Sequence, residues 1–202
     1  MAMKVSVSPA VVFMGLIFLI SGNIRQAFIP LLAAAIHEIG HITFAYLSKI
    51  KIERLDINLF GALISICPIG CTYKKEAMLA ASGPITNIIF AIFAYALLQK
   101  SNYDTDRGII LFIISSLFFA FINLLPAESF DGGRILNCCL LSVCTPDTAS
   151  KIMEWVSLLC IFLLWSVSVY FILKTGSYLS LFVFSGSIFS KIYLLHRKKE
   201  IG

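Results

Sequence analysis

Six apolar stretches follow one another along the chain, and each is long enough, or nearly so, to cross a lipid bilayer as a helix. A spanning helix needs roughly 17–25 mainly apolar residues. The stretches are 5–22, 27–47, 77–98, 108–126, 152–173 and 178–195. A shorter apolar piece, 135–143, is either a re-entrant half-helix or an extension of the fourth span. The pattern predicts an all-α polytopic membrane protein with about six transmembrane helices, forming one domain over residues 1–202.

The composition excludes the main alternatives to a membrane protein. Hydrophobic residues make up 59% of the 202 residues and charged residues only 13%. Disorder needs the opposite balance, and a soluble globule needs more polar surface than this chain provides. The six cysteines are too sparse for a secreted disulfide scaffold. The first stretch resembles a signal-peptide core, but residues 20–23 form a poor cleavage site, so we expect a retained helix.

Basic residues predict the orientation in the membrane, because they accumulate on the cytoplasmic side. With a cytoplasmic N-terminus, twelve of the sixteen lysines and arginines fall in cytoplasmic segments. We therefore expect a multi-pass protein of the cell membrane with both termini in the cytoplasm. Anionic lipid headgroups account for the formal net charge of +5, so no nucleic-acid partner is needed.

The segment between the second and third spans has a different pattern. Residues 55–59 alternate apolar and polar side chains, Phe60-Gly61 favours a turn, and 62–66 suit a return strand. We predict a short β-hairpin after the second helix. Backbone at membrane depth must be satisfied internally or line a wet cavity. We therefore expect the hairpin to be membrane-associated at the cytoplasmic interface, with a simple surface hairpin as the alternative.

The second span contains His37-Glu38-Ile39-Gly40-His41, an H-E-x-x-H motif. Residues four apart on a helix differ by about 40° in direction and rise about 6 Å. Both imidazoles can therefore bind one metal ion, while Glu38 acts as the general base on the attacking water. Ionisable groups in an apolar span are functional by default, and a structural polar cluster between helices is the alternative.

A zinc site with two histidines needs a third protein ligand, and a carboxylate is the usual one. Asp131 fits best among the acidic residues. Pro126 ends or kinks the fourth span, and Gly132-Gly133 allow backbone angles that turn Asp131 inward. Both halves of the site then lie towards the cytoplasmic side. Glu128 is the competing third ligand.

These motifs resemble those of the site-2 protease family of intramembrane zinc metalloproteases. The matching elements are His37-Glu38-Ile39-Gly40-His41, then Gly83-Pro84-Ile85-Thr86-Asn87, then N-L-L-P-x-x-x-F-D-G-G over residues 123–133. The resemblance covers about residues 27–140. Within the family, the chain resembles the compact type of the stage IV sporulation protease, without a PDZ or C-terminal nucleotide-sensing domain. The family usually carries a second proline where this chain has Glu128.

The resemblance implies one Zn²⁺ per chain, held by His37, His41 and Asp131. It implies a metalloendopeptidase that hydrolyses a peptide bond within or near the transmembrane segment of a membrane-protein substrate, as in regulated intramembrane proteolysis. Glu38 would take a proton from the water and deliver it to the leaving amine.

The resemblance also assigns substrate binding to Asn87 and Asn123, for which helix–helix hydrogen bonding is the structural alternative. An extended substrate segment could pair with the edge of the predicted hairpin by strand addition. A regulatory membrane partner or a homo-oligomer stays open.

Two other classes of function compete with the protease. A transporter or channel would place ionisable groups on several spans, whereas here they concentrate on the second span and after the fourth. An inactive homologue that only binds membrane proteins would be expected to lack a motif residue, and none is missing.

Overall fold

Five helices and three short strands make up the described part of the computed structural model, which comprises residues 4–7, 24–50, 52–58, 61–66, 72–100 and 107–175. In chain order the elements are β1 (Lys4–Val7), α2 (Ile24–Leu47), β2 (Ile52–Asn58), β3 (Gly61–Ile66), α3 (Tyr73–Lys100), α4 (Arg107–Asn123), α5 (Asp131–Val143) and α6 (Pro146–Thr175). The chain forms two compact units, Met1–Asn123 and Leu124–Gly202. Whether they act as the single predicted domain stays a prediction.

Four of the predicted spans correspond to helices. Among the described residues, α2, α3 and α6 contain segments long and apolar enough to cross a membrane, namely Phe28–Leu47, Tyr73–Gln99 and Pro146–Tyr170. The fourth predicted span becomes α4, which is a shorter apolar helix of 17 residues. It ends at Asn123, ahead of Pro126, because the residues just before a proline disfavour helical geometry.

The helices expose large apolar side chains, as lipid-facing helices do. Ile92 on α3 is 63% exposed and Phe162 on α6 is 61% exposed. Extended apolar surface of this kind is unusual on a water-soluble monomer. The small residues Ala33, Ala80 and Ala120 are instead buried, which allows close helix packing.

One sequence expectation is wrong, and one of two open alternatives is excluded. The first predicted span cannot begin at residue 5, because Lys4–Val7 is strand β1. Its alternation of polar Lys4 and Ser6 with two valines is the period of a strand rather than of a spanning helix. The piece 135–143 does not extend the fourth span, because α5 is a separate helix that starts after a loop over 124–130. The rest of the first span and the sixth span lie outside the described residues.

The three strands form one sheet in the order β1-β2-β3. Strands β2 and β3 are antiparallel, with Asn58 opposite Gly61, in the segment where the sequence predicts the hairpin. Strand β1, which the sequence did not predict, pairs with β2 in parallel, with Val7 opposite Ile57. The central strand is therefore β2, and both of its edges are occupied.

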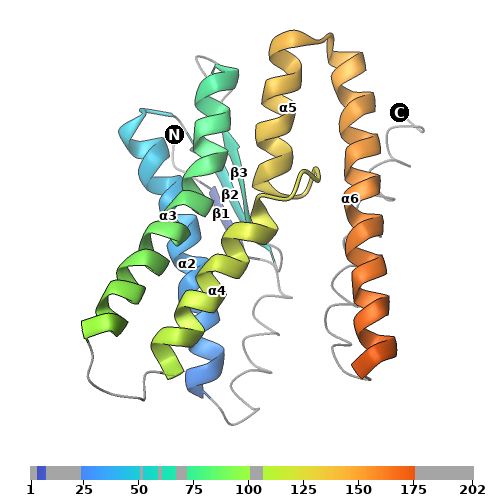
Figure 1. Cartoon of the computed structure of the whole chain (residues 1–202). Coiled ribbons are helices and arrows are strands. Elements are labelled where there is room, and N and C mark those ends of the chain that lie inside the picture. The colour runs from blue at the N-terminus through green and yellow to red at the C-terminus, as the bar shows by residue number, and fades with distance from the viewer. Residues whose placement is uncertain are drawn as a thin grey trace. The chain divides into compact units, whose positions relative to one another are not determined.

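Within the first unit, α2, α3 and α4 lie against one another, as Figure 1 shows. Helix α2 ends at Leu47 and is followed by a left-handed residue, Lys49, with φ 55°. The Ile50 N–H donates to the Ala45 carbonyl at 2.9 Å, which is the closing bond of a Schellman motif. This cap turns the chain out of α2 two turns after His41.

Within the second unit, α5 packs against α6 (Figure 1). Phe130 precedes α5 in an extended conformation, with φ −117° and ψ 164°. Asp131 occupies the first turn of α5, where the helix dipole favours a negative charge.

Candidate metal centre

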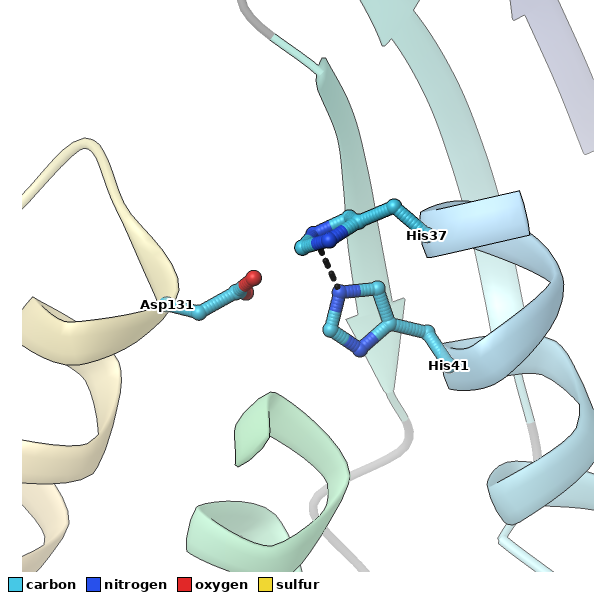
Figure 2. A group of neighbouring side chains, drawn as sticks. All are labelled: His37, His41 and Asp131. Atoms are coloured by element: carbon cyan, nitrogen blue, oxygen red, sulfur yellow. Dashed lines mark hydrogen bonds between the residues drawn. The ribbon is translucent and has the colours of Figure 1, made fainter. Parts of the chain in front are cut away.

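The histidine pair of helix α2 is buried. His37 is 4% exposed and His41 is 3% exposed. Their ring centroids are 4.8 Å apart and the ring planes are nearly perpendicular, at 83°. The two Nε2 atoms face each other at 3.2 Å and share a hydrogen bond, drawn as the dashed line in Figure 2. The i, i+4 spacing therefore brings the rings together as the sequence predicts.

The distance between these nitrogens suits zinc. Zinc binds histidine nitrogen at about 2.0–2.1 Å in tetrahedral geometry, which places two such ligands about 3.3 Å apart. The observed 3.2 Å between the Nε2 atoms of His37 and His41 is close to this value. The spacing of these two donor nitrogens therefore fits a zinc ion.

Helix α3 supplies the outer partner of His41. The Nδ1–H of His41 donates to the Leu79 carbonyl at 2.8 Å. Ser82 Oγ lies 3.3 Å from the same Nδ1 and donates to the Leu79 carbonyl at 2.6 Å. Since Nδ1 carries the proton, the Nε2 atom of His41 carries the lone pair that a metal ion needs. An outer carbonyl of this kind is the usual second contact of a metal-binding histidine.

Asn87, one of the two predicted substrate-binding asparagines, contacts the other histidine. Its side chain is completely buried on α3, and Nδ2 lies 3.4 Å from Nδ1 of His37. The other asparagine, Asn123, donates from Nδ2 to the Phe119 carbonyl in its own helix at 3.0 Å. The structure thus brings Asn87, but not Asn123, into hydrogen-bond contact with the histidine pair.

Two glycines allow the close approach of α2 and α3 at this level. A Cβ added to Gly83 would meet Nε2 of His41 and would lie 2.8 Å from Cε1 of His37. A Cβ added to Gly40 would meet the Thr86 side chain on the facing helix. The sequence analysis attached no role to Gly40. The sequence signal for Gly40 was its position between the two histidines, three residues after His37.

Glu38 lies on α2 next to His37 and is half-buried. The residue keeps partial exposure, but its carboxylate oxygen Oε2 is buried. Its role as the general base stays a prediction.

In the second unit, two glycines at the start of α5 allow the preceding loop to pack closely against the helix. A Cβ at Gly132 would meet the Leu124 carbonyl, and one at Gly133 would meet the Ala127 carbonyl. The sequence analysis explained these glycines by unusual backbone angles, and this explanation is wrong. Both lie in α5, and the missing side chains make room for carbonyl groups of the preceding loop.

The two acidic candidates for the third ligand differ in exposure. The side chain of Asp131 is 9% exposed, whereas that of Glu128 is exposed. The backbone N–H of Glu128 donates to Oγ of Ser157 on α6 at 3.0 Å. This bond attaches the loop to α6 through the backbone of Glu128.

A buried histidine pair in an apolar helix, backed by a second apolar helix, defines a membrane protein with a candidate zinc centre. Comparison with known proteins shows which family the chain resembles. The sequence model of peptidase family M50 matches residues 27–103. Stage IV sporulation protein FB of Bacillus subtilis is 28% identical over 135 residues, 66% of this chain and 46% of that protein. A zinc metalloprotease of Methanocaldococcus jannaschii is 27% identical over 110 residues, 54% of this chain and 32% of that protein.

The chain therefore spans less than half the length of these two relatives. The fold is similar to the solved structure of a site-2 protease from Methanocaldococcus jannaschii, with a TM-score of 0.67 at 18% identity. That similarity covers 96% of this chain and 91% of the other, and at this identity it shows the fold alone. Together with the motifs, the sequence matches support the site-2 protease family, peptidase family M50, as the family of this chain.

Proposed function

We propose that this chain is a zinc-dependent intramembrane endopeptidase. It hydrolyses a peptide bond within or near the transmembrane segment of a membrane-protein substrate. The observation that carries the proposal is the buried pair of Nε2 atoms of His37 and His41, 3.2 Å apart. This spacing is close to the roughly 3.3 Å expected for two imidazoles on one tetrahedral zinc ion.

We infer that Asp131 is the third protein ligand, so that the two units act together as one metalloprotease domain. Figure 2 draws the three side chains of this ligand set, His37, His41 and Asp131, which are of the types that could hold one metal ion. The low exposure of Asp131 supports it over Glu128, whose side chain is exposed. A carboxylate beside two histidines is a common catalytic zinc set.

Zinc bound there would supply Lewis-acid activation of a water molecule and of the scissile carbonyl. Glu38 takes the proton of the attacking water and returns it to the leaving amine. Its position next to His37, half-buried on the same helix, supports this role. General acid–base catalysis of this kind contributes about 10²–10⁴-fold to a rate.

The substrate is a transmembrane helix that must unwind locally, and an extended segment of it adds to the sheet. The sheet order refines which edge is available. Since β2 is the central strand, a substrate strand must add to β3 or β1. A proline introduced into β2, at Asp56 or Asn58, would disrupt the sheet itself and so cannot test this addition. Strand β3 continues from β2 and leads into α3, the helix behind the histidine pair, so we favour β3.

Proline scanning of β3 tests this strand addition. Adjacent residues of an antiparallel strand direct their N–H groups alternately to the partner and away from it. Of Leu63→Pro and Ile64→Pro, we therefore expect one to damage the sheet and the other to slow cleavage with the fold and zinc retained. Normal cleavage by the folded variant would exclude addition at β3.

We further propose the topology that the basic residues predict: about six spans, both termini in the cytoplasm, and the site and sheet towards the cytoplasmic side. The membrane-spanning character of α2, α3 and α6 supports the multi-pass arrangement. Contact of Asn123 with substrate stays a prediction.

A cleavage assay tests the proposed function. The purified chain is reconstituted into liposomes with candidate single-span proteins, and loss of the intact substrate is followed. We expect wild type to cleave, Glu38→Gln to keep zinc with cleavage reduced by about 10²–10⁴-fold, and Asp131→Ala to lose both zinc and cleavage. Undiminished proteolysis by Glu38→Gln would refute the assignment of the general base.

A further inference from the structure

Only one of the two polar atoms of the buried Asn87 amide has a hydrogen-bond partner among the described residues. Its Nδ2 group contacts Nδ1 of His37, and the side chain is 0% exposed. Its Oδ1 atom has no hydrogen-bond partner within the part of the chain that the structure describes. A buried polar atom left in this state is destabilising, because it has lost its contact with water without gaining a partner. Such atoms are rare in native proteins and call for a specific explanation.

The donor and the acceptor of each of these hydrogen bonds around the histidine pair can be assigned. An amide nitrogen can only donate, so Asn87 Nδ2 donates to Nδ1 of His37. The ring proton of His37 is therefore on Nε2, which donates to Nε2 of His41 at 3.2 Å. His41 in turn carries its proton on Nδ1 and donates it to the Leu79 carbonyl. These hydrogen bonds connect Asn87 to the Leu79 carbonyl through both imidazole rings.

A metal ion at this site would need the opposite tautomer of His37. Binding at Nε2 uses the lone pair of that atom, so the ring proton must be on Nδ1, and Nδ1–H then needs an acceptor. Asn87 presents its nitrogen to Nδ1 in the structure. Rotation of the amide by half a turn would present Oδ1, the atom that lacks a partner. The imidazole ring of His37 carries one proton in both tautomers.

We propose that Asn87 is a positioning residue that selects the metal-binding tautomer of His37 by rotation of its side-chain amide. The inference rests on the proposed zinc site and goes beyond the substrate-binding role expected for this asparagine. His41 needs no such adjustment, because its outer partner is a backbone carbonyl that can only accept. The two histidines therefore differ: His41 is preset for metal and His37 is set by Asn87.

Zinc affinity of Asn87 variants tests the role without an activity measurement. Asn87→Leu removes the acceptor, and Asn87→Asp provides one that needs no rotation. Ser116→Ala is the matched control, because it removes a fully buried polar group from α4. Affinities are measured on the whole chain in detergent by competition with a chromophoric zinc chelator.

We expect Asn87→Leu to bind zinc about 10–100-fold more weakly, the usual effect of losing such an outer partner. Asn87→Asp should bind at least as tightly as wild type, and Ser116→Ala should be unchanged. Equal affinity in Asn87→Leu, or equal weakening in Asn87→Leu and Asn87→Asp, would overturn the positioning role. If wild type itself binds no zinc, the proposed function fails instead, so the two failures are distinguishable.

The tautomer can also be observed directly in wild type, which keeps the test independent of how the variants fold. The chain has only 3 histidines, so ¹⁵N-histidine labelling gives an assignable NMR spectrum. We expect His37 to carry its proton on Nε2 without metal and on Nδ1 with zinc, while His41 carries it on Nδ1 in both states. The same His37 tautomer in both states would contradict the proposal.

Discussion

Replacing Gly83 by alanine should weaken zinc binding without touching any ligand. The added Cβ would meet Nε2 of His41 and would lie 2.6 Å from Cε1 of His41 and 2.8 Å from Cε1 of His37. Ordinary contacts between such atoms are about 3.5–4.0 Å, so each ring must retreat by roughly 1 Å. Zinc–ligand distances tolerate only about 0.2 Å.

The expected loss follows from the cost of overpacking. Inserting a methyl group into a packed site costs about 1–3 kcal/mol. If that cost falls on the zinc-bound state, the affinity drops by about 5–150-fold, because 1.4 kcal/mol corresponds to a factor of ten. Chelator competition on the purified chain in detergent measures this change.

Gly108→Ala is the control for the same substitution in a helix. Its Cβ would lie 3.6 Å from Cδ1 of Ile29, an ordinary contact, so zinc affinity should equal that of wild type. Unchanged zinc affinity in Gly83→Ala would show that the rings beside Gly83 do not hold the metal ion.

Two further predictions concern the stability of the first unit, measured by thermal unfolding in detergent. Gly40→Ala should cost about 1–3 kcal/mol, because its Cβ would meet the Thr86 side chain and would lie 2.9 Å from the Ser82 carbonyl; an unchanged unfolding midpoint would contradict this. Lys49→Gly should raise the stability by up to about 1 kcal/mol. The left-handed conformation costs a residue other than glycine roughly 1–2 kcal/mol, and the larger conformational entropy that glycine loses on folding offsets part of this gain. A lower midpoint in Lys49→Gly would show that the φ of 55° is not strained.

The features that the sequence predicted are those set by short-range spacing. Apolar length was enough for α2, α3 and α6, since a helix that crosses a bilayer must satisfy its own backbone. The i, i+4 interval was enough to place His37 beside His41, because helical geometry alone brings them together.

The features that the sequence missed depend on which surfaces meet. Strand β1 has only four residues, and it is stabilised by pairing with β2 about fifty residues later in the chain. The Leu79 carbonyl behind His41 is a backbone atom, so no residue type marks it. The role of Gly132 was misread because the close approach of the Leu124 carbonyl depends on how the loop folds back.

The zinc content of the purified 202-residue chain shows whether His37 and His41 are metal ligands. Elemental analysis should find about one zinc per chain, as in a single catalytic site, for wild type and for Glu38→Gln. His37→Asn and His41→Asn should each contain almost none. A full complement of zinc in either histidine variant would contradict the account.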